Sequence, residues 1–138
     1  MSSKRDLLML KIINTGAKSK LPFTPAIIAG DFIYVSGQAS VDPDDGAIIK
    51  GTFEEEMRRS IENMRSILEA GGLSLDHVIN VKSYVAEQSD LPEYNRIYAE
   101  YFSLPVPTRS TIMGVLGTML KFELDCVAYA PNTRQEAL

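Results

Sequence analysis

The clearest run of hydrophobic positions in the chain lies between Thr52 and Gly72 and is typical of an amphipathic helix. Its apolar side chains recur every three or four residues and therefore fall on one face, namely Phe53, Met57, Ile61, Met64 and Leu68. Thr52 and Glu55 have the spacing of a capping box, which predicts the beginning of the helix. Gly71 and Gly72 predict its end. We expect the apolar face of this amphipathic helix to pack against a sheet.

A second helix is predicted from about residue 90. Asp90 is the expected N-cap, and Pro92 is tolerated in the first helical turn. The apolar stripe of this helix consists of Tyr94, Ile97, Tyr98, Tyr101 and Phe102. A stripe with this spacing indicates a core-facing helix rather than a cofactor site.

Short apolar runs predict several strands. Residues 27–29 and 32–35 flank Gly30-Asp31, which favours a hairpin. Gly37 continues the second of these strands and indicates a bulge or a close backbone approach. Further strands are expected at 78–85, with Ile79, Val81 and Val85 on one face, at 109–115 and at 119–130.

The predicted order is two strands, helix, strand, helix, two strands, with an optional early strand at 11–13. Two helices and several strands in one small chain favour an α+β fold with both helices on one face of the sheet. The other face of the sheet would then be exposed, and self-association of the chain would bury it. No repeat or linker stands out, so we expect a single domain over residues 1–138, with its core at about 11–131.

Arg109 and Glu123 are the polar pair best placed for chemistry. If the last two strands form a hairpin near Leu116-Gly117, the two residues are cross-strand neighbours. A guanidinium can grip a small carboxylate through two hydrogen bonds, and a nearby carboxylate can move protons. From the spacing alone, a structural ion pair is the more common explanation. A shift of one residue in the register would place the two side chains on opposite faces.

Amino-acid composition limits the kinds of site and partner that the protein can have. The 138 residues include one Cys, one His and no Trp, so an internal disulfide and a Cys/His zinc site are excluded. Cys126 is expected on the core face, and His77 in a loop. The net charge of -4 argues against nucleic-acid binding. The first apolar run is too short for a signal peptide or a membrane span, so we expect a cytoplasmic protein that does not bind membranes.

Taken in order, several short motifs resemble those of the RidA (YjgF-like) family of reactive intermediate imine deaminases. The likeness covers about residues 14–131. It is carried by Pro22-Phe23, Pro25-Ala26-Ile27, Tyr34-Val35-Ser36-Gly37-Gln38, Leu68-Glu69-Ala70-Gly71-Gly72-Leu73, Tyr94-Asn95, Tyr101-Phe102, Pro107-Thr108-Arg109-Ser110 and Lys121-Phe122-Glu123-Leu124. Each motif is weak alone, and their order and spacing make the signal specific.

The resemblance implies a chorismate-mutase-like fold assembled as a homotrimeric barrel, with ligand sites between subunits. It implies hydrolysis of 2-aminoacrylate- or 2-iminobutanoate-type intermediates to 2-keto acids and ammonia, without a metal or organic cofactor. Arg109 matches the carboxylate-binding arginine, and Glu123 matches the glutamate that handles the water or the imine nitrogen. The other matched pocket residues are Ser36, Gly37, Asn95, Thr111 and, as a pocket wall, Phe23.

Two departures from the family pattern bear on the substrate. Phe23 stands where the family often has a tyrosine, and the segment between Arg109 and Glu123 is slightly short. An aminomuconate-type or pyrimidine-breakdown intermediate would fit these differences equally well. The rival functions are a non-catalytic sensor of small acids, an RNA-cleaving or translation-inhibiting role, and a structural trimer with an inactive site.

Overall fold

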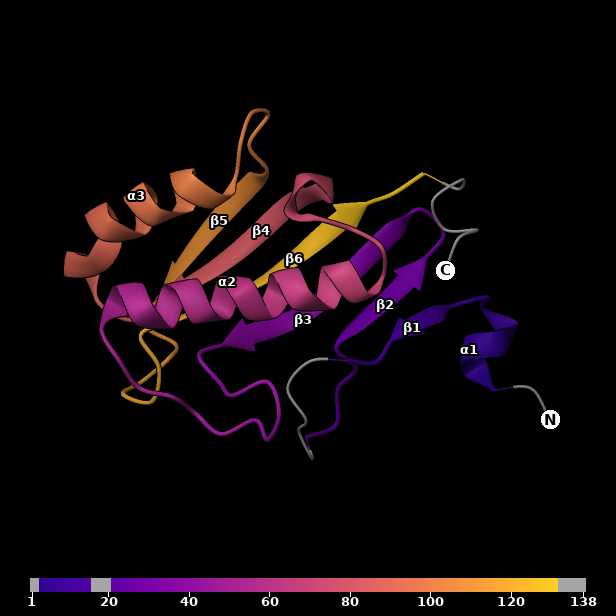
Figure 1. Cartoon of the computed structure of the whole chain (residues 1–138), viewed down its shortest axis with the longest axis horizontal. Helices are drawn as coiled ribbons and strands as arrows, with labels where there is room; N and C mark the ends of the chain where they lie inside the picture. The colour runs from indigo at the N-terminus through magenta and orange to yellow at the C-terminus, as the bar shows by residue number, and fades with distance from the viewer. Residues whose placement is uncertain (1–2, 16–20, 132–138) are drawn as a thin grey trace.

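The computed structural model describes residues 3–15 and 21–131, and its two long helices cover one face of a six-stranded sheet (Figure 1). The strands are β1 (Lys11–Ile13), β2 (Ala26–Ala29), β3 (Phe32–Ala39), β4 (Val78–Val85), β5 (Thr108–Met113) and β6 (Phe122–Tyr129). The helices are α1 (Lys4–Leu7), α2 (Phe53–Ala70) and α3 (Leu91–Tyr101), with the 3-10 turns η1 (Leu75–His77) and η2 (Gln88–Asp90). The predicted α+β class is confirmed, and the optional strand at 11–13 is present.

The strand order of the sheet is β1-β2-β3-β6-β4-β5. All neighbouring strands are antiparallel except β4 and β5, which are parallel and are joined through α3. The last strand, β6, therefore lies inside the sheet between β3 and β4 (Figure 1). Its two ladders place residues from distant parts of the chain beside it.

The predicted hairpin between the strands that carry Arg109 and Glu123 is wrong. Arg109 pairs with Val81 on one side of β4, whereas Glu123 pairs with Tyr84 on its other side. A crossover through a helix delivers the next strand in parallel, so α3 places β5 at the edge of the sheet. The segment after β5 then leads past β4 to the interior position of β6.

The prediction for α2 is confirmed in detail. The Thr52 hydroxyl accepts a hydrogen bond from the Glu55 backbone N–H at 3.1 Å, and the Glu55 carboxylate accepts one from the Thr52 N–H at 2.8 Å. This capping box satisfies two backbone donors that the first helical turn leaves free. All five residues of the predicted apolar face are buried, namely Phe53, Met57, Ile61, Met64 and Leu68.

The hairpin of β2 and β3 turns at Gly30, whose φ of +61° lies in the left-handed region that favours glycine. Gly37 marks a β-bulge, because the register between β3 and β6 shifts between Val35 and Gln38. A Cβ atom on Gly37 would lie 3.2 Å from Glu123 Oε2. Both properties expected of Gly37, a bulge and a close approach, are present.

Two local predictions need correction. Ile79 is 42% exposed and does not share the buried face of Val81 and Val85, because a register shift at the start of β4 turns its side chain outward. Asp90 makes no side-chain capping bond, because the turn η2 runs directly into α3 and gives Asp90 a helical backbone. Pro92 does lie in the first turn of α3, as expected.

The face of the sheet away from the helices carries exposed apolar side chains. Phe32 and Tyr34 of β3 point away from buried Ile33, and Tyr129 of β6 lies opposite Phe32, with their ring centroids 5.4 Å apart. Tyr34 is 53% exposed. We call Phe32, Tyr34 and Tyr129 the aromatic strip; exposed aromatic groups of this kind favour a second protein surface as a cover.

Candidate functional site

Glu123 projects from the face of the sheet away from the helices. Its neighbours in β6, Phe122 and Leu124, are fully buried in the core, so the alternation of the strand turns Glu123 the other way. In the next strand Tyr84 lies opposite Glu123, and the Tyr84 hydroxyl donates a hydrogen bond to Asp125 Oδ2 at 2.8 Å. Glu123 therefore lies in a group of acidic and phenolic side chains.

Burial raises the pKa of Glu123 above its ordinary value of 4.5, and the neighbouring Asp125 carboxylate raises it further. The same neighbourhood raises the pKa of Tyr84 to about 12, mainly through burial and then through the hydrogen bond to Asp125. A carboxyl whose pKa is moved toward neutrality is suited to accept a proton and give it up again. Asp125 therefore sets part of the charge environment of Glu123.

A cavity of about 280 Å3 brings Glu123 together with two other predicted site residues, Phe23 and Gly37. The other side chains around it are largely apolar and include Leu21, Val41, Ile48 and Leu120. Such a lining with one convergent carboxylate is typical of a small-molecule site. Phe23 is 48% exposed and forms part of the wall of this cavity, without a hydroxyl to contribute.

Ser36 holds the segment that carries Phe23 against the strand. Its hydroxyl donates a hydrogen bond of 2.5 Å to the Thr24 carbonyl, and its backbone N–H donates to the Pro25 carbonyl at 2.9 Å. The donor of the hydroxyl is thus used inside the chain, and its oxygen is left to accept from a ligand. We call Phe23, Ser36, Gly37 and Glu123 the Glu123 cluster.

Arg109 lies on the opposite face of the sheet, the one that α3 covers. Its guanidinium carbon is 4.8 Å from the ring centroid of Tyr94 and 4.9 Å from that of Tyr98. Both tyrosines are buried in the core on α3. In the part of the chain that the structure describes, no carboxylate pairs with Arg109.

Thr111 follows two residues after Arg109 and so shares its face of β5. Its hydroxyl and that of Tyr94 are joined by a hydrogen bond of 2.9 Å. Asn95 is exposed on α3 directly after Tyr94. We call Arg109, Thr111, Tyr94 and Asn95 the Arg109 cluster.

The structural ion pair between Arg109 and Glu123 is therefore not formed within one chain. The two residues are separated by β4 and lie on opposite faces of the sheet. Both keep their charge available to another molecule.

Cys126 and His77 have roles inside the fold. Cys126 is buried, and burial raises the pKa of its thiol to about 12, which makes it a poor nucleophile. The Nδ1 atom of His77 accepts a hydrogen bond of 3.0 Å from the Ser74 backbone N–H and caps η1. Within residues 3–15 and 21–131 no three His, Cys, Asp or Glu side chains are grouped as metal ligands, and no helix is long and apolar enough to cross a membrane.

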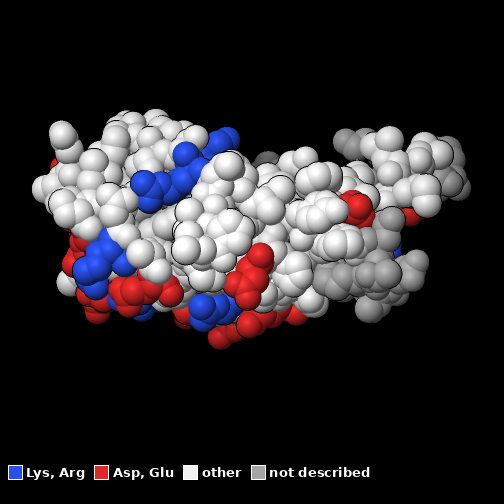
Figure 2. All heavy atoms as spheres, turned by 90° about the horizontal axis from the view of Figure 1, so that it is seen from above, with Lys and Arg blue, Asp and Glu red and all other residues white. Residues whose placement is uncertain are grey.

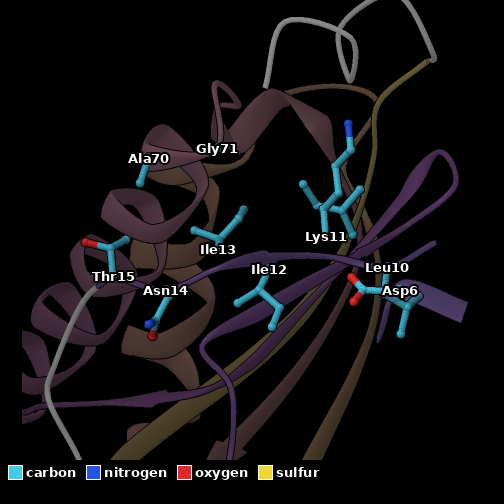
Figure 3. A pocket seen from close by; sticks show the side chains of 10 residues that line it. Asp6, Leu10, Lys11, Ile12, Ile13, Asn14, Thr15, Ala70 and Gly71 are labelled. Carbon is cyan, nitrogen blue, oxygen red and sulfur yellow. The ribbon is translucent and has the colours of Figure 1, made fainter. Parts of the chain in front are cut away.

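A larger cavity of about 610 Å3 lies at the far edge of the sheet (Figure 3). It is formed by β1 and the segments around it, with Ala70 and Gly71 at the end of α2. None of the predicted site residues lines it. It therefore plays no part in the chemistry considered below.

Comparison with known proteins shows the family to which the chain belongs. Residues 15–130 match the model of the family described as Endoribonuclease L-PSP, which is the YjgF/RidA family. This match covers most of the chain. The chain belongs to the RidA family.

Individual relatives within the RidA family bear different names. A RutC family protein of Pyrococcus horikoshii is 38% identical over 109 residues, which cover 78% of this chain and 86% of that protein. The human 2-iminobutanoate/2-iminopropanoate deaminase is 31% identical over 108 residues, covering 78% and 79%. The crystal structure of RidA from an Antarctic Psychrobacter has a TM-score of 0.76 at 25% identity, covering 83% and 94%. The fold is thus that of RidA proteins.

Sequence reasoning missed the two tyrosines beneath Arg109. The stripe on α3 was predicted as core, and Tyr94 and Tyr98 are indeed buried. Their contact with Arg109 depends on the parallel pairing that places β5 beside β4 under α3. The signal that could have indicated this pairing is the strand-helix-strand order of β4, α3 and β5, which is typical of a parallel crossover.

Proposed function

We propose that the protein is an imine deaminase that hydrolyses reactive 2-aminoacrylate- or 2-iminobutanoate-type intermediates to 2-keto acids and ammonia. The observation that carries the proposal is Glu123, a half-buried carboxyl with a raised pKa at a small cavity beside Phe23 and Gly37. Membership of a family with a human relative named 2-iminobutanoate/2-iminopropanoate deaminase gives independent support. No metal or organic cofactor is needed for this reaction.

We further propose that the working molecule is a homotrimer whose sites lie between subunits. Two features support this assembly. The aromatic strip is exposed, and the Arg109 and Glu123 clusters face opposite sides of one sheet. A second chain would bring its Arg109 toward the Glu123 cavity and so complete a site that one chain leaves divided.

Arg109 binds the substrate carboxylate in this proposal. A guanidinium presents two parallel N–H donors that match the two oxygens of a carboxylate. Fixing the acid at one end places the imine carbon at a constant position in the cleft. Such positioning converts an encounter with water into an oriented attack.

Glu123 moves the protons. Its carboxylate takes a proton from a water molecule as the water oxygen bonds to the imine carbon. The carboxyl then gives that proton to the nitrogen, which yields a carbinolamine. The carboxylate next takes the hydroxyl proton of the carbinolamine and passes it to the nitrogen as the carbon–nitrogen bond breaks, so that ammonia leaves and the keto group forms. The raised pKa of Glu123 suits both steps, because it makes the carboxylate a stronger base than an ordinary glutamate while the carboxyl can still return the proton.

An endoribonuclease, the activity in the family's description, is the weaker candidate for this chain. Figure 2 shows Lys and Arg side chains next to Asp and Glu side chains along one edge of the molecule, and a short group of Lys and Arg side chains away from that edge, with mostly uncharged residues elsewhere on that face. On α2, Arg58 is paired with Glu54 and Glu100, and Arg65 with Glu62. Such pairs offer phosphates no continuous basic surface.

The proposal is tested by generating 2-iminobutanoate with an amino-acid-consuming enzyme and measuring the release of 2-oxobutanoate and ammonia. We expect the protein to accelerate release, and Arg109→Ala and Glu123→Gln each to reduce kcat/KM by about a hundredfold or more. Arg65→Ala serves as the matched control, because Arg65 is a paired surface arginine on α2.

Turnover of Arg109→Ala or Glu123→Gln at the wild-type rate would contradict this mechanism. Binding of 2-oxobutanoate without any turnover would favour the sensor of small acids. An RNA-cleaving activity that survives repeated purification and is lost in Glu123→Gln would favour the nuclease instead.

A further inference from the structure

Tyr94 lies beneath Arg109 and contacts more of the Arg109 cluster than any other aromatic side chain of α3. We propose that Tyr94 is a positioning residue that contacts Thr111, in the same strand as Arg109, and fixes the Arg109 guanidinium in the orientation in which it meets the substrate. The inference rests on the proposed function, since that function assigns the substrate carboxylate to Arg109.

The ring of Tyr94 attracts the guanidinium without using its hydrogen-bond donors. The Arg109 guanidinium carbon lies 4.8 Å from the centroid of Tyr94 and 4.9 Å from that of Tyr98. Attraction between a cation and the negative face of a ring depends on the charge, so the N–H groups stay available. Arg109 is thereby held in place and remains able to grip a carboxylate with two hydrogen bonds.

The hydroxyl of Tyr94 fixes the other end of the Arg109 cluster. It forms a hydrogen bond of 2.9 Å with Thr111 Oγ1, on the same face of β5 as Arg109. One side chain therefore contacts both residues through different atoms: Arg109 through its ring and Thr111 through its hydroxyl. Among the described residues, no hydrogen bond is formed by the hydroxyl of Tyr98, so Tyr98 supports only the guanidinium.

Tyr94 is itself immobilised by the core. It is 1% exposed, and its ring packs 6.0 Å from that of Phe122 and 5.9 Å from that of Tyr98. Phe122 belongs to β6 and directly precedes Glu123 in the chain. Tyr94 is therefore a fixed support beneath an edge strand whose Arg109 is otherwise exposed.

The first test replaces the ring and the hydroxyl separately. Tyr94→Met keeps an apolar side chain and removes the ring, and we expect the KM for the imine to rise about three- to tenfold with a smaller change in kcat. Tyr94→Phe keeps the ring and should hold KM within about twofold of the wild type. A rise in KM for Tyr94→Phe as large as that for Tyr94→Met would overturn the role of the ring.

Tyr101→Met is the matched control. Tyr101 lies on the same helix and also receives arginine guanidinium groups, from Arg58 at 5.7 Å and Arg65 at 5.4 Å, but it is outside the Arg109 cluster. We expect this variant to keep the wild-type KM. Equal KM values for Tyr94→Met and Tyr101→Met would show that Tyr94 is only a core residue.

A double-mutant cycle separates this inference from the proposed function. If Tyr94 acts through Arg109, then Tyr94→Met causes no further loss of kcat/KM in a chain that already carries Arg109→Ala. Additive losses would overturn the positioning role and leave the proposed function intact. An Arg109→Ala variant with full activity would instead overturn the proposed function.

A measurement on the unaltered protein remains decisive if Tyr94→Met fails to fold or the activity of Arg109→Ala is too low to measure. The side-chain protons of Arg109, assigned in proton–nitrogen and proton–carbon spectra by comparison with Arg109→Lys, should be shifted upfield by the ring currents of Tyr94 and Tyr98. Shifts at the values of an unstructured arginine would show that the guanidinium does not rest on the rings, and would overturn the proposal.

Discussion

The Glu123 carboxyl lowers the free energy of unfolding at neutral pH. Its pKa is raised by burial and by Asp125, so the folded chain holds the proton more tightly than the unfolded chain does. At pH values below the pKa of Glu123 in the unfolded chain, both states are protonated, and Glu123 does not reduce the free energy of unfolding. As the pH rises through the interval between the unfolded and the folded pKa, the unfolded state ionises first and is favoured.

Glu123→Gln should therefore raise the melting temperature at pH 7 and match the wild type below about pH 4. Thermal unfolding followed by circular dichroism at both pH values measures the difference. Glu69→Gln is the control, because Glu69 is an exposed carboxylate on α2 and its neutralisation should change little. A variant that is less stable than the wild type at pH 7 would contradict the burial of a charged Glu123.

At the scale of elements, buried Glu56 joins the start of α2 to the start of β6. It is 1% exposed, and its carboxylate accepts hydrogen bonds from the backbone N–H groups of Gly51 at 3.1 Å and Lys121 at 3.0 Å. It also pairs with the Lys121 ammonium at 3.3 Å. The residue that leads into the strand of Glu123 is thus anchored to the helix.

Removing this anchor should destabilise the protein. We expect Glu56→Ala to lower the free energy of unfolding by about 2–4 kcal/mol, because two backbone donors lose their acceptor in a buried place. Denaturation by urea measures the change. Glu62→Ala, which removes an exposed acid paired with Arg65 on the same helix, should cost less than about 1 kcal/mol. Equal losses for the two variants would disprove the anchor.

The elements themselves were largely predictable from the sequence, whereas the partners of the strands were not. The spacing of apolar residues and the capping box located α2, and Cys126 was correctly assigned to the core face of β6. These patterns record which side of an element faces the core. They do not record which strand lies beside it, so the predicted hairpin of β5 and β6 was wrong.

The same distinction applies to the candidate site: its main residues were predicted from the sequence, whereas some of their contacts were not. Arg109 and Glu123 were expected from the family likeness, and the close approach of Gly37 to Glu123 follows from its position in a strand. The contacts of Arg109 with Tyr94 and Tyr98 required the parallel pairing of β4 and β5, which local patterns do not specify. Long-range pairing is therefore the physical information that the sequence pattern lacked.

On the scale of the whole molecule, the exposed aromatic strip is expected to be covered by other copies of the chain. A charged side chain placed there would be buried without a partner in the assembly, which is strongly unfavourable. Tyr34→Glu should therefore shift the protein toward monomers, and light scattering after size-exclusion chromatography measures the change.

Deaminase activity should fall together with assembly in Tyr34→Glu, because Arg109 and Glu123 lie on opposite faces of one sheet. Leu7→Glu, a charge introduced at a 73% exposed position on α1, is the control and should change neither property. A Tyr34→Glu monomer with full activity would show that one chain suffices for catalysis.

The central position of β6 has a consequence for how the protein is made. Residues 122–129 follow every other strand in the chain, yet they fill the place between β3 and β4. Until they leave the ribosome, β3 and β4 expose unpaired edges and the core lacks Phe122 and Leu124. Nascent chains should thus stay unfolded until β6 has been synthesised and depend on chaperones during that interval, and chains shortened before β6 should be degraded or aggregate.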